Sequence, residues 1–353
     1  MKKEHILVIR FSSLGDVAMA VPVVYSLARQ YPEIRITVLS RSYARALFED
    51  LAPNVGFMEA DVKREYKGIK GLNALYRRLT AKQFTAIADL HNVLRSEFLR
   101  MRFNMGRYRV EHINKHRKGR RRITSALNKR LTQQPSSFQN YVEVFERLGY
   151  SVNIQFTSIF HQGGGDLNLL PATFSSLTAN HSPLIGIAPF AAHKGKVYPP
   201  ALMREVIAQL TKQHPNARIF FFGRGAEEER YFNEWCQGFQ QCIDTSQQLK
   251  SMREELILMS HLDVMLSMDS ANMHLASLTG IPVVSIWGAT HPYAGFMGWG
   301  QSWNNAIQTE MDCRPCSIFG QKPCRFGDYP CLNNIKPETV IEKINTLLLT
   351  KNK

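Results

Sequence analysis

The 353-residue chain carries 44 Lys and Arg against 29 Asp and Glu, a formal net charge of +15, and is 44% hydrophobic. This composition excludes wholesale disorder and low-complexity or collagen-like architecture, and the length predicts two domains of about 150 residues each. Nucleic acid, an anionic membrane surface or a phosphorylated substrate would each account for the positive charge, and the alternative is a solvated surface.

Targeting signals are absent from the sequence pattern. No apolar run approaches the ~20 residues of a membrane-spanning helix. The apolar stretch that follows the first lysines ends at Arg10, which is too early for a signal peptide. We therefore expect a cytoplasmic protein.

Short apolar strands alternate with amphipathic segments in the first half. The pattern predicts strands at 5–11, 35–40, 55–58 and 84–90. It predicts helices at 17–30, 43–50, 71–82 and 142–148. Strands separated by helices indicate βαβ units and a parallel sheet.

The stretch 95–130 interrupts this rhythm. It holds thirteen Lys and Arg but only two acidic residues, Glu97 and Glu111. The densest part, 115–122, is too charged to pack and predicts a loop or an exposed helix start.

A Gly-rich segment at 161–166 predicts the linker, after which the alternation resumes. We expect strands at 184–188, 217–222, 263–267 and 282–287 and helices at 200–214, 227–239, 250–260 and 271–279. The expected domains are 1–165 and 166–335, followed by a C-terminal helix at 336–353 that packs back on the N-terminal domain. Ligands of such sheets bind at the carboxyl ends of the strands, here in a cleft between the halves.

Two strand ends in this pattern carry candidate reactive groups. Ser12, Ser13 and Asp16 follow the first strand, where they serve either as helix caps or, for Asp16, as a general base. No G-x-G-x-x-G pattern is present there, so dinucleotide binding is unsupported. Lys196 precedes the helix at 200–214, where it either neutralises a diphosphate or is a solvated charge like its neighbours His193 and Lys194.

Two helix starts in the second half carry carboxylates. Glu227 opens a helix as one of three acidic residues, a pattern that suits the helix dipole as well as a ribose contact. Asp269 ends a buried strand directly before a helix whose backbone N–H groups suit an anion, and Asp269 itself suits sugar hydroxyls. His274 on that helix is expected to be a core residue.

The last motif is a group of four cysteines, Cys313, Cys316, Cys324 and Cys331. Four thiolates in one short loop suit a tetrahedral zinc site. The spacing lacks the second C-x2-C pair of common zinc ribbons, so free or variably oxidised thiols are the favoured interpretation and a metal-free protein is expected.

Taken in order along nearly the whole chain, these blocks resemble glycosyltransferase family nine, the ADP-heptose:lipopolysaccharide heptosyltransferases. The resemblance is carried by 6–16, 89–96, 196–199, 227–229, 269–274, 288–290 and the Cys-Arg-Pro-Cys loop at 313–316. It implies a GT-B fold, in which two Rossmann-like α/β domains with parallel sheets face each other across a cleft. It also implies inverting transfer without metal or cofactor. The chain departs from the pattern at Ala271, where the family often has Gly, at Tyr198, which replaces Trp, and at Ala191 and Ala192.

The resemblance assigns roles to individual residues. Asp16 becomes the catalytic base, Glu227 contacts the ribose, Asp269 contacts the transferred heptose, and Lys196, Ser270 and Ala271 contact the donor phosphates. Expected acceptor contacts are Ser13, Arg95, Arg120, Arg121 and Arg122 on the N-terminal half.

The partners implied are ADP-heptose and an anionic, lipid-linked inner-core acceptor, reached by a monomer at the cytoplasmic face of the inner membrane. Nucleic acid is not expected. The alternatives are a transferase of another nucleotide sugar for a surface polysaccharide, and a non-catalytic protein that binds anionic lipid or nucleic acid.

Overall fold

The computed structural model describes residues 4–161, 163–174, 177 and 182–351. Internal contacts divide the chain into two compact units. One comprises Met1–His116 with Pro135–Ile159, and the other comprises Arg117–Gln134 with Phe160–Lys353. Residues 117–122 of the densest basic stretch therefore belong to the second unit, although they precede the end of the first in sequence.

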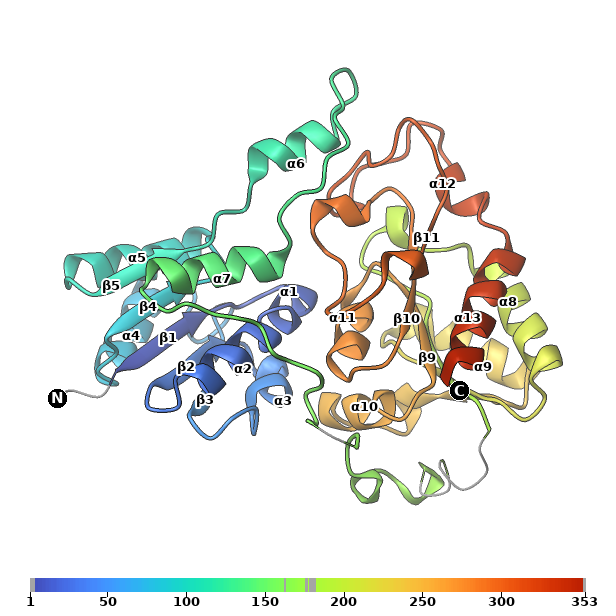
Figure 1. Ribbon diagram of the computed structural model, residues 1–353, viewed down its shortest axis with the longest axis horizontal. Helices are drawn as coiled ribbons and strands as arrows, with labels where there is room; N and C mark the ends of the chain where they lie inside the picture. Colours follow the sequence, from blue (N-terminus) through green and yellow to red (C-terminus); the bar gives the residue numbers. More distant parts are fainter. Residues whose placement is uncertain (1–3, 162, 175–176, 178–181, 352–353) are drawn as a thin grey trace. The chain divides into compact units, whose positions relative to one another are not determined.

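The first unit is built on a five-stranded parallel sheet in the order β3-β2-β1-β4-β5 (Figure 1). Its strands are β1 (His5–Ile9), β2 (Arg35–Ser40), β3 (Val55–Glu59), β4 (Ala86–Asp89) and β5 (Arg109–His112). β1 and β4 are buried along their whole length, as expected for central strands covered on both faces.

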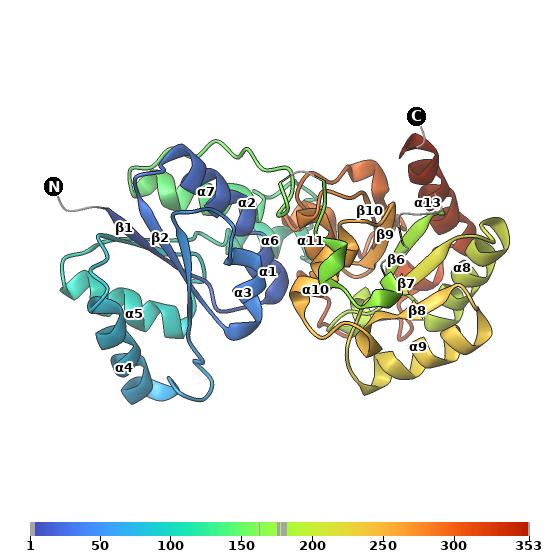
Figure 2. The same ribbon diagram turned by 90° about the horizontal axis from the view of Figure 1, so that it is seen from below.

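Helices cover both faces of this sheet. They are α1 (Leu14–Ala18), α2 (Val21–Gln30), α3 (Arg45–Phe48), α4 (Gly68–Thr80), α5 (Leu94–Met105) and α7 (Ser137–Arg147). Figure 2 shows α4 and α5 on one face and α2 and α7 on the other. Leu75 of α4 and Leu99 and Phe103 of α5 share a core with Leu7 and Ile9 of β1.

Two predictions in this unit need correction. The helix expected at 17–30 is broken between α1 and α2, because Pro22 lacks the N–H group that would continue the ladder. The stretch from 95 also contains the regular elements α5 and β5, which the pattern missed. The many cationic residues of α5 make its apolar periodicity, which comes from the buried Leu99 and Phe103, hard to recognise in the sequence.

The second unit is built on a six-stranded parallel sheet in the order β11-β10-β9-β6-β7-β8. Its strands are β6 (Leu184–Ala188), β7 (Arg218–Phe221), β8 (Cys242–Asp244), β9 (Val264–Met268), β10 (Val283–Trp287) and β11 (Ala306–Gln308). Its helices are α6 (Arg117–Ile123), α8 (Pro200–Gln213), α9 (Ala226–Gly238), α10 (Met252–Met259), α11 (Ala271–Leu278), α12 (Pro330–Asn333) and α13 (Pro337–Lys351). None of the helices in the described part of the chain has the length and apolar character needed to cross a membrane.

The C-terminal helix belongs to the second unit. α13 packs against α8 and lies beside β9 and β10. Val340, Ile341 and Ile344 join the core that holds Ile207 and Leu210 of α8. The apolar face of α13 is thus buried in the core of the second unit.

In each sheet the strand order changes direction once. The chain runs from β1 outward to β3 and returns beside β1 as β4, and it runs from β6 outward to β8 and returns beside β6 as β9. Ligands of open α/β sheets bind at such switch points, outside the carboxyl ends of the strands. A ligand site is therefore expected at the carboxyl ends of β1, β4, β6 and β9.

Candidate active site

Asp16 lies in the first turn after β1. Its Oδ2 is 2.5 Å from Nη2 of Arg10 and accepts a 2.7 Å hydrogen bond from the Ser13 hydroxyl. The backbone N–H of Ser13 also points to this oxygen at 3.3 Å, so Asp16 takes part in the helix cap that the sequence suggested. The Asp16 side chain is 23% exposed.

Arg10 forms the ion pair with this carboxylate from the buried side. It is almost fully buried and also donates to the carbonyl oxygen of Leu90 at 2.6 Å. Burial acts to lower the pKa of Arg10, but the charge of Asp16 and its hydrogen bond outweigh that effect and raise it. The sequence pattern gave Arg10 no role. Its position could have indicated one, because a charged residue directly after an apolar, buried strand needs a partner.

The end of β4 contributes a second cluster. Asp89 is fully buried, accepts the backbone N–H groups of His91 and Asn92 at 2.9 Å, and pairs with Arg100 at 3.2 Å. These bonds fix the turn that places Nε2 of His91 3.4 Å from the Ser12 hydroxyl oxygen.

His91 is uncharged at neutral pH. Burial, followed by the charges of Arg10 and Lys115, lowers the pKa of His91 to about 3. Arg95, the predicted acceptor contact nearby, lies exposed at the start of α5. The edge of the first sheet therefore presents the Asp16 carboxylate and a neutral imidazole.

The edge of the second sheet is dominated by one ion pair. Nζ of Lys196 lies 2.9 Å from Oδ2 of Asp269, with 15% and 4% of the two side chains exposed. Lys196 closes the 3-10 turn Lys194–Lys196 after β6, and Asp269 follows β9. Gly320 lets the lysine stem pass, because a Cβ atom there would lie 2.7 Å from Cγ of Lys196.

The amino end of α11 lies directly after Asp269. Ser270 is the N-cap in extended conformation, Ala271 is the first helical residue, and the Ser270 side chain does not cap the helix. The Ser270 hydroxyl instead lies 3.3 Å from that of Ser267. The first-turn N–H groups of this eight-residue helix thus adjoin the Lys196–Asp269 pair, an arrangement suited to an anion. His274 is buried as expected.

Only one of the three acidic residues that open α9 is available to a ligand. Glu228 turns back to the backbone N–H of Arg224 at 3.0 Å, and burial raises its pKa. Glu229 accepts from the N–H of Gly225 at 3.3 Å. Glu227 is exposed and, within the described residues, its carboxylate makes no hydrogen bond.

Arg314 organises the loop beside these groups, a role that the sequence did not reveal. Its buried guanidinium donates to the carbonyl oxygens of Gly288 (2.6 Å), Trp287 (2.9 Å) and Thr290 (3.0 Å) and to that of Thr309. Ala289, which follows Gly288 in the loop after β10, donates its backbone N–H to the carbonyl oxygen of Gly195 at 2.8 Å. Arg314 therefore fixes the turn that ends in Lys196.

The four clustered cysteines are free thiols. Among residues 4–161, 163–174, 177 and 182–351, no three or more His, Cys, Asp or Glu side chains are placed to hold a metal ion. Burial raises the pKa of Cys316, and it raises that of Cys331 to about 11. Both groups are therefore protonated thiols at neutral pH.

The three predicted acceptor arginines of α6 differ from one another. The guanidinium of Arg120 packs over the ring of Phe296, 4.5 Å from its centroid, whereas Arg121 and Arg122 are exposed. All three belong to the second unit, which corrects their expected place on the N-terminal half. Contacts with Phe296 and with the loop after β11 tie the segment there.

Tyr198 is also not a ligand-facing residue. Its side chain is fully buried, and its hydroxyl donates to the carbonyl oxygen of Ile335 at 2.7 Å. The exchange of Trp for Tyr at this position therefore acts on the contact with the start of α13 and not on a ligand.

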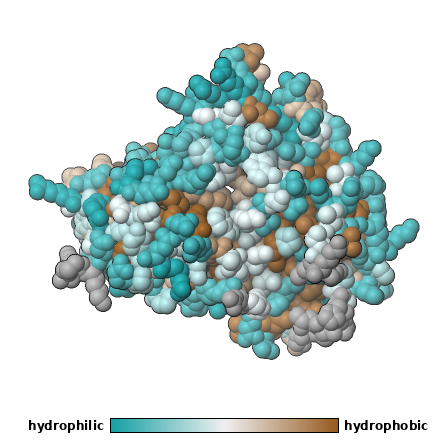
Figure 3. Space-filling view, in the orientation of Figure 1, coloured by the Kyte–Doolittle hydropathy of each residue, from teal (hydrophilic) through white to brown (hydrophobic). Residues whose placement is uncertain are grey.

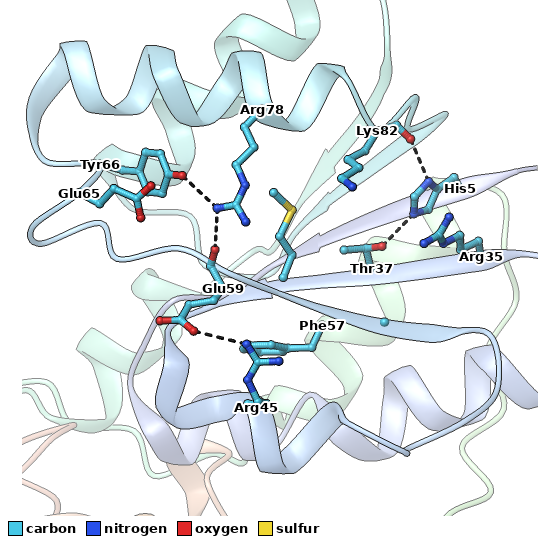
Figure 4. A pocket seen from close by; sticks show the side chains of 12 residues that line it. His5, Arg35, Thr37, Arg45, Phe57, Glu59, Glu65, Tyr66, Arg78 and Lys82 are labelled. Carbon is cyan, nitrogen blue, oxygen red and sulfur yellow. Dashed lines mark hydrogen bonds and ion pairs between the residues drawn. The ribbon is translucent and has the colours of Figure 1, made fainter.

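A cavity of about 610 Å3 opens on the first unit over β2 and β3. Figure 4 shows His5, Thr37 and Arg35 at one end and Tyr66 and Arg78 at the other. Several polar groups pair internally: Nε2 of His5 lies 2.8 Å from the Thr37 hydroxyl, and Arg78 donates to the Tyr66 hydroxyl at 2.9 Å. The cavity begins at the amino ends of β1 and β2, so it is separate from the candidate site.

Comparisons with known proteins show the family of this chain. A family model described as glycosyltransferase family 9 (heptosyltransferase) matches residues 72–329. The lipooligosaccharide heptosyltransferase 2 of Campylobacter jejuni subsp. jejuni serotype O:2 is 23% identical over 349 residues, which covers 95% of each chain.

Two solved structures share the fold. The Escherichia coli ADP-heptose lipopolysaccharide heptosyltransferase II superposes with a TM-score of 0.68 at 18% identity, over 99% of this chain and 100% of the other. An E. coli heptosyltransferase with ADP-2-deoxy-2-fluoro heptose superposes with a TM-score of 0.68 at 17% identity, over 97% of this chain and 99% of the other. The predicted GT-B class, with two α/β units built on parallel sheets, is thereby confirmed.

Proposed function

The chain belongs to glycosyltransferase family 9 and is a glycosyltransferase, and we propose that it transfers heptose from ADP-heptose to the inner core of a lipopolysaccharide. The observation that carries the donor assignment is the Lys196–Asp269 pair beside the amino end of α11. Two of the relatives act on, or are bound with, ADP-linked heptose by their titles. A donor of this kind needs a diphosphate site, and on this chain we assign that site to Lys196 and the amino end of α11.

The donor is held by groups of both signs. Lys196 and the N–H groups of Ser270 and Ala271 neutralise the diphosphate, and the exposed Glu227 accepts from the ribose hydroxyls. Asp269 accepts from hydroxyls of the heptose. Because these charges are fixed before reaction, they stabilise the leaving group without a divalent cation.

The transfer itself is a single displacement with inversion. Asp16 takes the proton of an acceptor hydroxyl as that oxygen attacks the anomeric carbon. The bond from the anomeric carbon to the diphosphate oxygen breaks, and its electron pair leaves with ADP. Arg10 pairs with Asp16 at 2.5 Å, which holds the carboxylate in place for this role.

The acceptor side is assigned to exposed cations. Ser13 and Arg95 are exposed at the starts of α1 and α5, and Arg121 and Arg122 are exposed on α6. Such groups suit the phosphates and carboxylates of a lipid-linked inner core. Arg120, which packs on Phe296, supports the segment instead. We place the protein, as a monomer, at the cytoplasmic face of the inner membrane.

The test is transfer with purified components. The protein is incubated with heptose-deficient lipopolysaccharide and, in separate reactions, ADP-heptose, ADP-glucose, UDP-glucose or GDP-mannose, and the lipid product is analysed by mass spectrometry. We expect a gain of one heptose with ADP-heptose alone. A gain of hexose from another donor, or no product with any donor, would overturn the assignment.

A further inference from the structure

The segment 117–134, here called the basic segment, contains seven Lys and Arg and no Asp or Glu. A run of one charge repels itself and is disfavoured as packed structure. This one is nonetheless ordered as α6 followed by a turn, in which the N–H of Arg130 donates to the carbonyl oxygen of Arg122 at 3.3 Å. Its fold therefore depends on contacts outside the segment.

Three contacts attach the basic segment to the second unit. Arg120 packs over Phe296, and Nζ of Lys129 donates to the carbonyl oxygens of Asp312 and Pro315 at 2.8 and 3.2 Å. The N–H of Gln134 donates to the carbonyl oxygen of Tyr293 at 2.9 Å. Two of the seven cationic side chains are thus used as anchors.

The other five cationic side chains point to solvent. They are Arg117, Lys118, Arg121, Arg122 and Arg130. At the turn between them, Leu127 is 94% exposed and Leu131 is 47% exposed. In Figure 3 the end of the basic segment, at the top of the view, is coloured hydrophobic and is surrounded by hydrophilic residues.

The neighbouring loop extends the same character. Phe319 is about half exposed, and its ring lies 5.9 Å from that of Phe296, on which Arg120 packs. Phe326 is also about half exposed and lies under the guanidinium of Arg325. Exposed apolar side chains therefore alternate with cations over two segments of one unit.

We propose that the basic segment is a membrane-docking element, in which Leu127 and Leu131 enter the interface of an anionic bilayer while the surrounding cations contact lipid phosphates. Cations alone would suit any polyanion, but the exposed Leu127 and Leu131 beside them favour a surface that has an apolar interior below its phosphates, as a bilayer has. Bilayer binding rises with buried apolar area and with attraction to anionic lipid, and this element supplies both. The proposal deepens the membrane placement in the proposed function and rests on it for its biological setting.

The element belongs to the unit that carries Lys196 and Asp269. A bilayer contact made through it would therefore hold the proposed donor unit at the membrane directly. The N-terminal, acceptor-side half is where the sequence had placed this charge.

The test is co-sedimentation of the full chain with vesicles of phosphatidylcholine, with and without phosphatidylglycerol, in the absence of donor and acceptor. The Leu127→Ser/Leu131→Ser variant and the Arg117→Gln/Lys118→Gln/Arg130→Gln variant are each expected to lower the partition coefficient on anionic vesicles roughly tenfold. The matched controls are Leu169→Ser, another exposed leucine of the second unit, and Arg204→Gln/Lys212→Gln/Lys336→Gln, three exposed cations elsewhere on it. We expect both controls to bind as the unmodified protein does.

Two results would overturn the proposal. One is equal binding to neutral and anionic vesicles, and the other is a leucine variant that binds vesicles normally. Loss of duplex DNA binding in the cation variant with vesicle binding retained would assign the surface to nucleic acid instead. Because no sugar is present in the assay, failure of the proposed transferase activity would leave its result unchanged.

Discussion

Nζ of Lys196 and Oδ2 of Asp269 form a 2.9 Å ion pair that joins the ends of β6 and β9. Both side chains are nearly buried, so solvent screens their attraction little. A diphosphate that enters here competes with Asp269 for the ammonium group. In the proposed reaction, donor binding thus frees the Asp269 carboxylate for the sugar hydroxyls at the moment they arrive.

Replacing Lys196 with Gln is expected to weaken ADP binding by roughly 10- to 100-fold, the range of a lost charge-assisted hydrogen bond. Adenosine, which lacks the phosphates, should bind equally to both proteins. Titration calorimetry with the two ligands measures the difference. The control is Lys194→Gln, which removes an exposed charge from the same turn.

This substitution also leaves Asp269 buried without its partner, which costs stability. The double variant Lys196→Gln/Asp269→Asn should recover the free energy of unfolding but not the ADP affinity. If the double variant bound ADP like the unmodified protein, Lys196 would act through folding and not through the phosphates.

Arg314→Lys should destabilise the second unit. A lysine keeps the charge but cannot supply the fork of donors that reaches Gly288, Trp287 and Thr290 together. With buried carbonyl groups left unpaired, the free energy of unfolding should fall by about 3 kcal/mol. Denaturant unfolding checks this value against Arg325→Lys, an exposed arginine in the same loop, which should change little.

Arg314→Lys should also reduce ADP affinity, because the stretch it holds supports Gly195 and hence Lys196. Normal stability together with normal affinity in Arg314→Lys would remove the organising role assigned to this residue.

His91 is expected to make stability depend on pH. Its pKa is lowered to about 3 in the folded protein, by burial first and then by Arg10, so the unfolded chain binds the proton more readily. The stabilisation is complete above about pH 6.5 and is lost as the pH falls toward 3. Between about pH 7 and about pH 5 this one group should cost about 2 kcal/mol.

His91→Gln removes that contribution. The measurement is the free energy of unfolding from denaturant titrations at both pH values, compared between the variant and the unmodified protein. The variant should lose less stability on acidification. Equal losses in the two proteins would show that His91 is not held neutral by its surroundings.

Most of the fold was predictable because its strands are short apolar runs that end at turn residues. β2 (Arg35–Ser40) and β6 (Leu184–Ala188) match their predicted bounds, since both are buried on two faces. β8 and β11, three residues each, carry too few residues to give a period. The packing of α13 was also out of reach, because an apolar face does not specify which core receives it.

The candidate residues were found because each follows a strand. Chain order brings Asp16 to the end of β1, and it brings Lys196 and Asp269 to the ends of adjacent strands. Their supporting residues were missed for the opposite reason. Arg10 donates to the carbonyl oxygen of Leu90, and Arg314 donates to that of Gly288. Both acceptors lie far from the arginine in sequence, and no local pattern records such contacts.

Asp16 is the proposed base of the transfer. Asp16→Asn keeps the size of the side chain and its acceptance of the Ser13 hydroxyl but cannot take a proton. Circular dichroism and ADP titration of the variant control for loss of the Arg10 pair. Because ADP is assigned to the second unit, its dissociation constant should not change.

The most direct measurement is the turnover rate of Asp16→Asn with ADP-heptose and heptose-deficient lipopolysaccharide, both saturating. We predict that kcat falls by about 10²- to 10⁴-fold, the contribution of a general base, while ADP affinity is retained. Turnover at the unmodified rate in the folded variant would contradict the account.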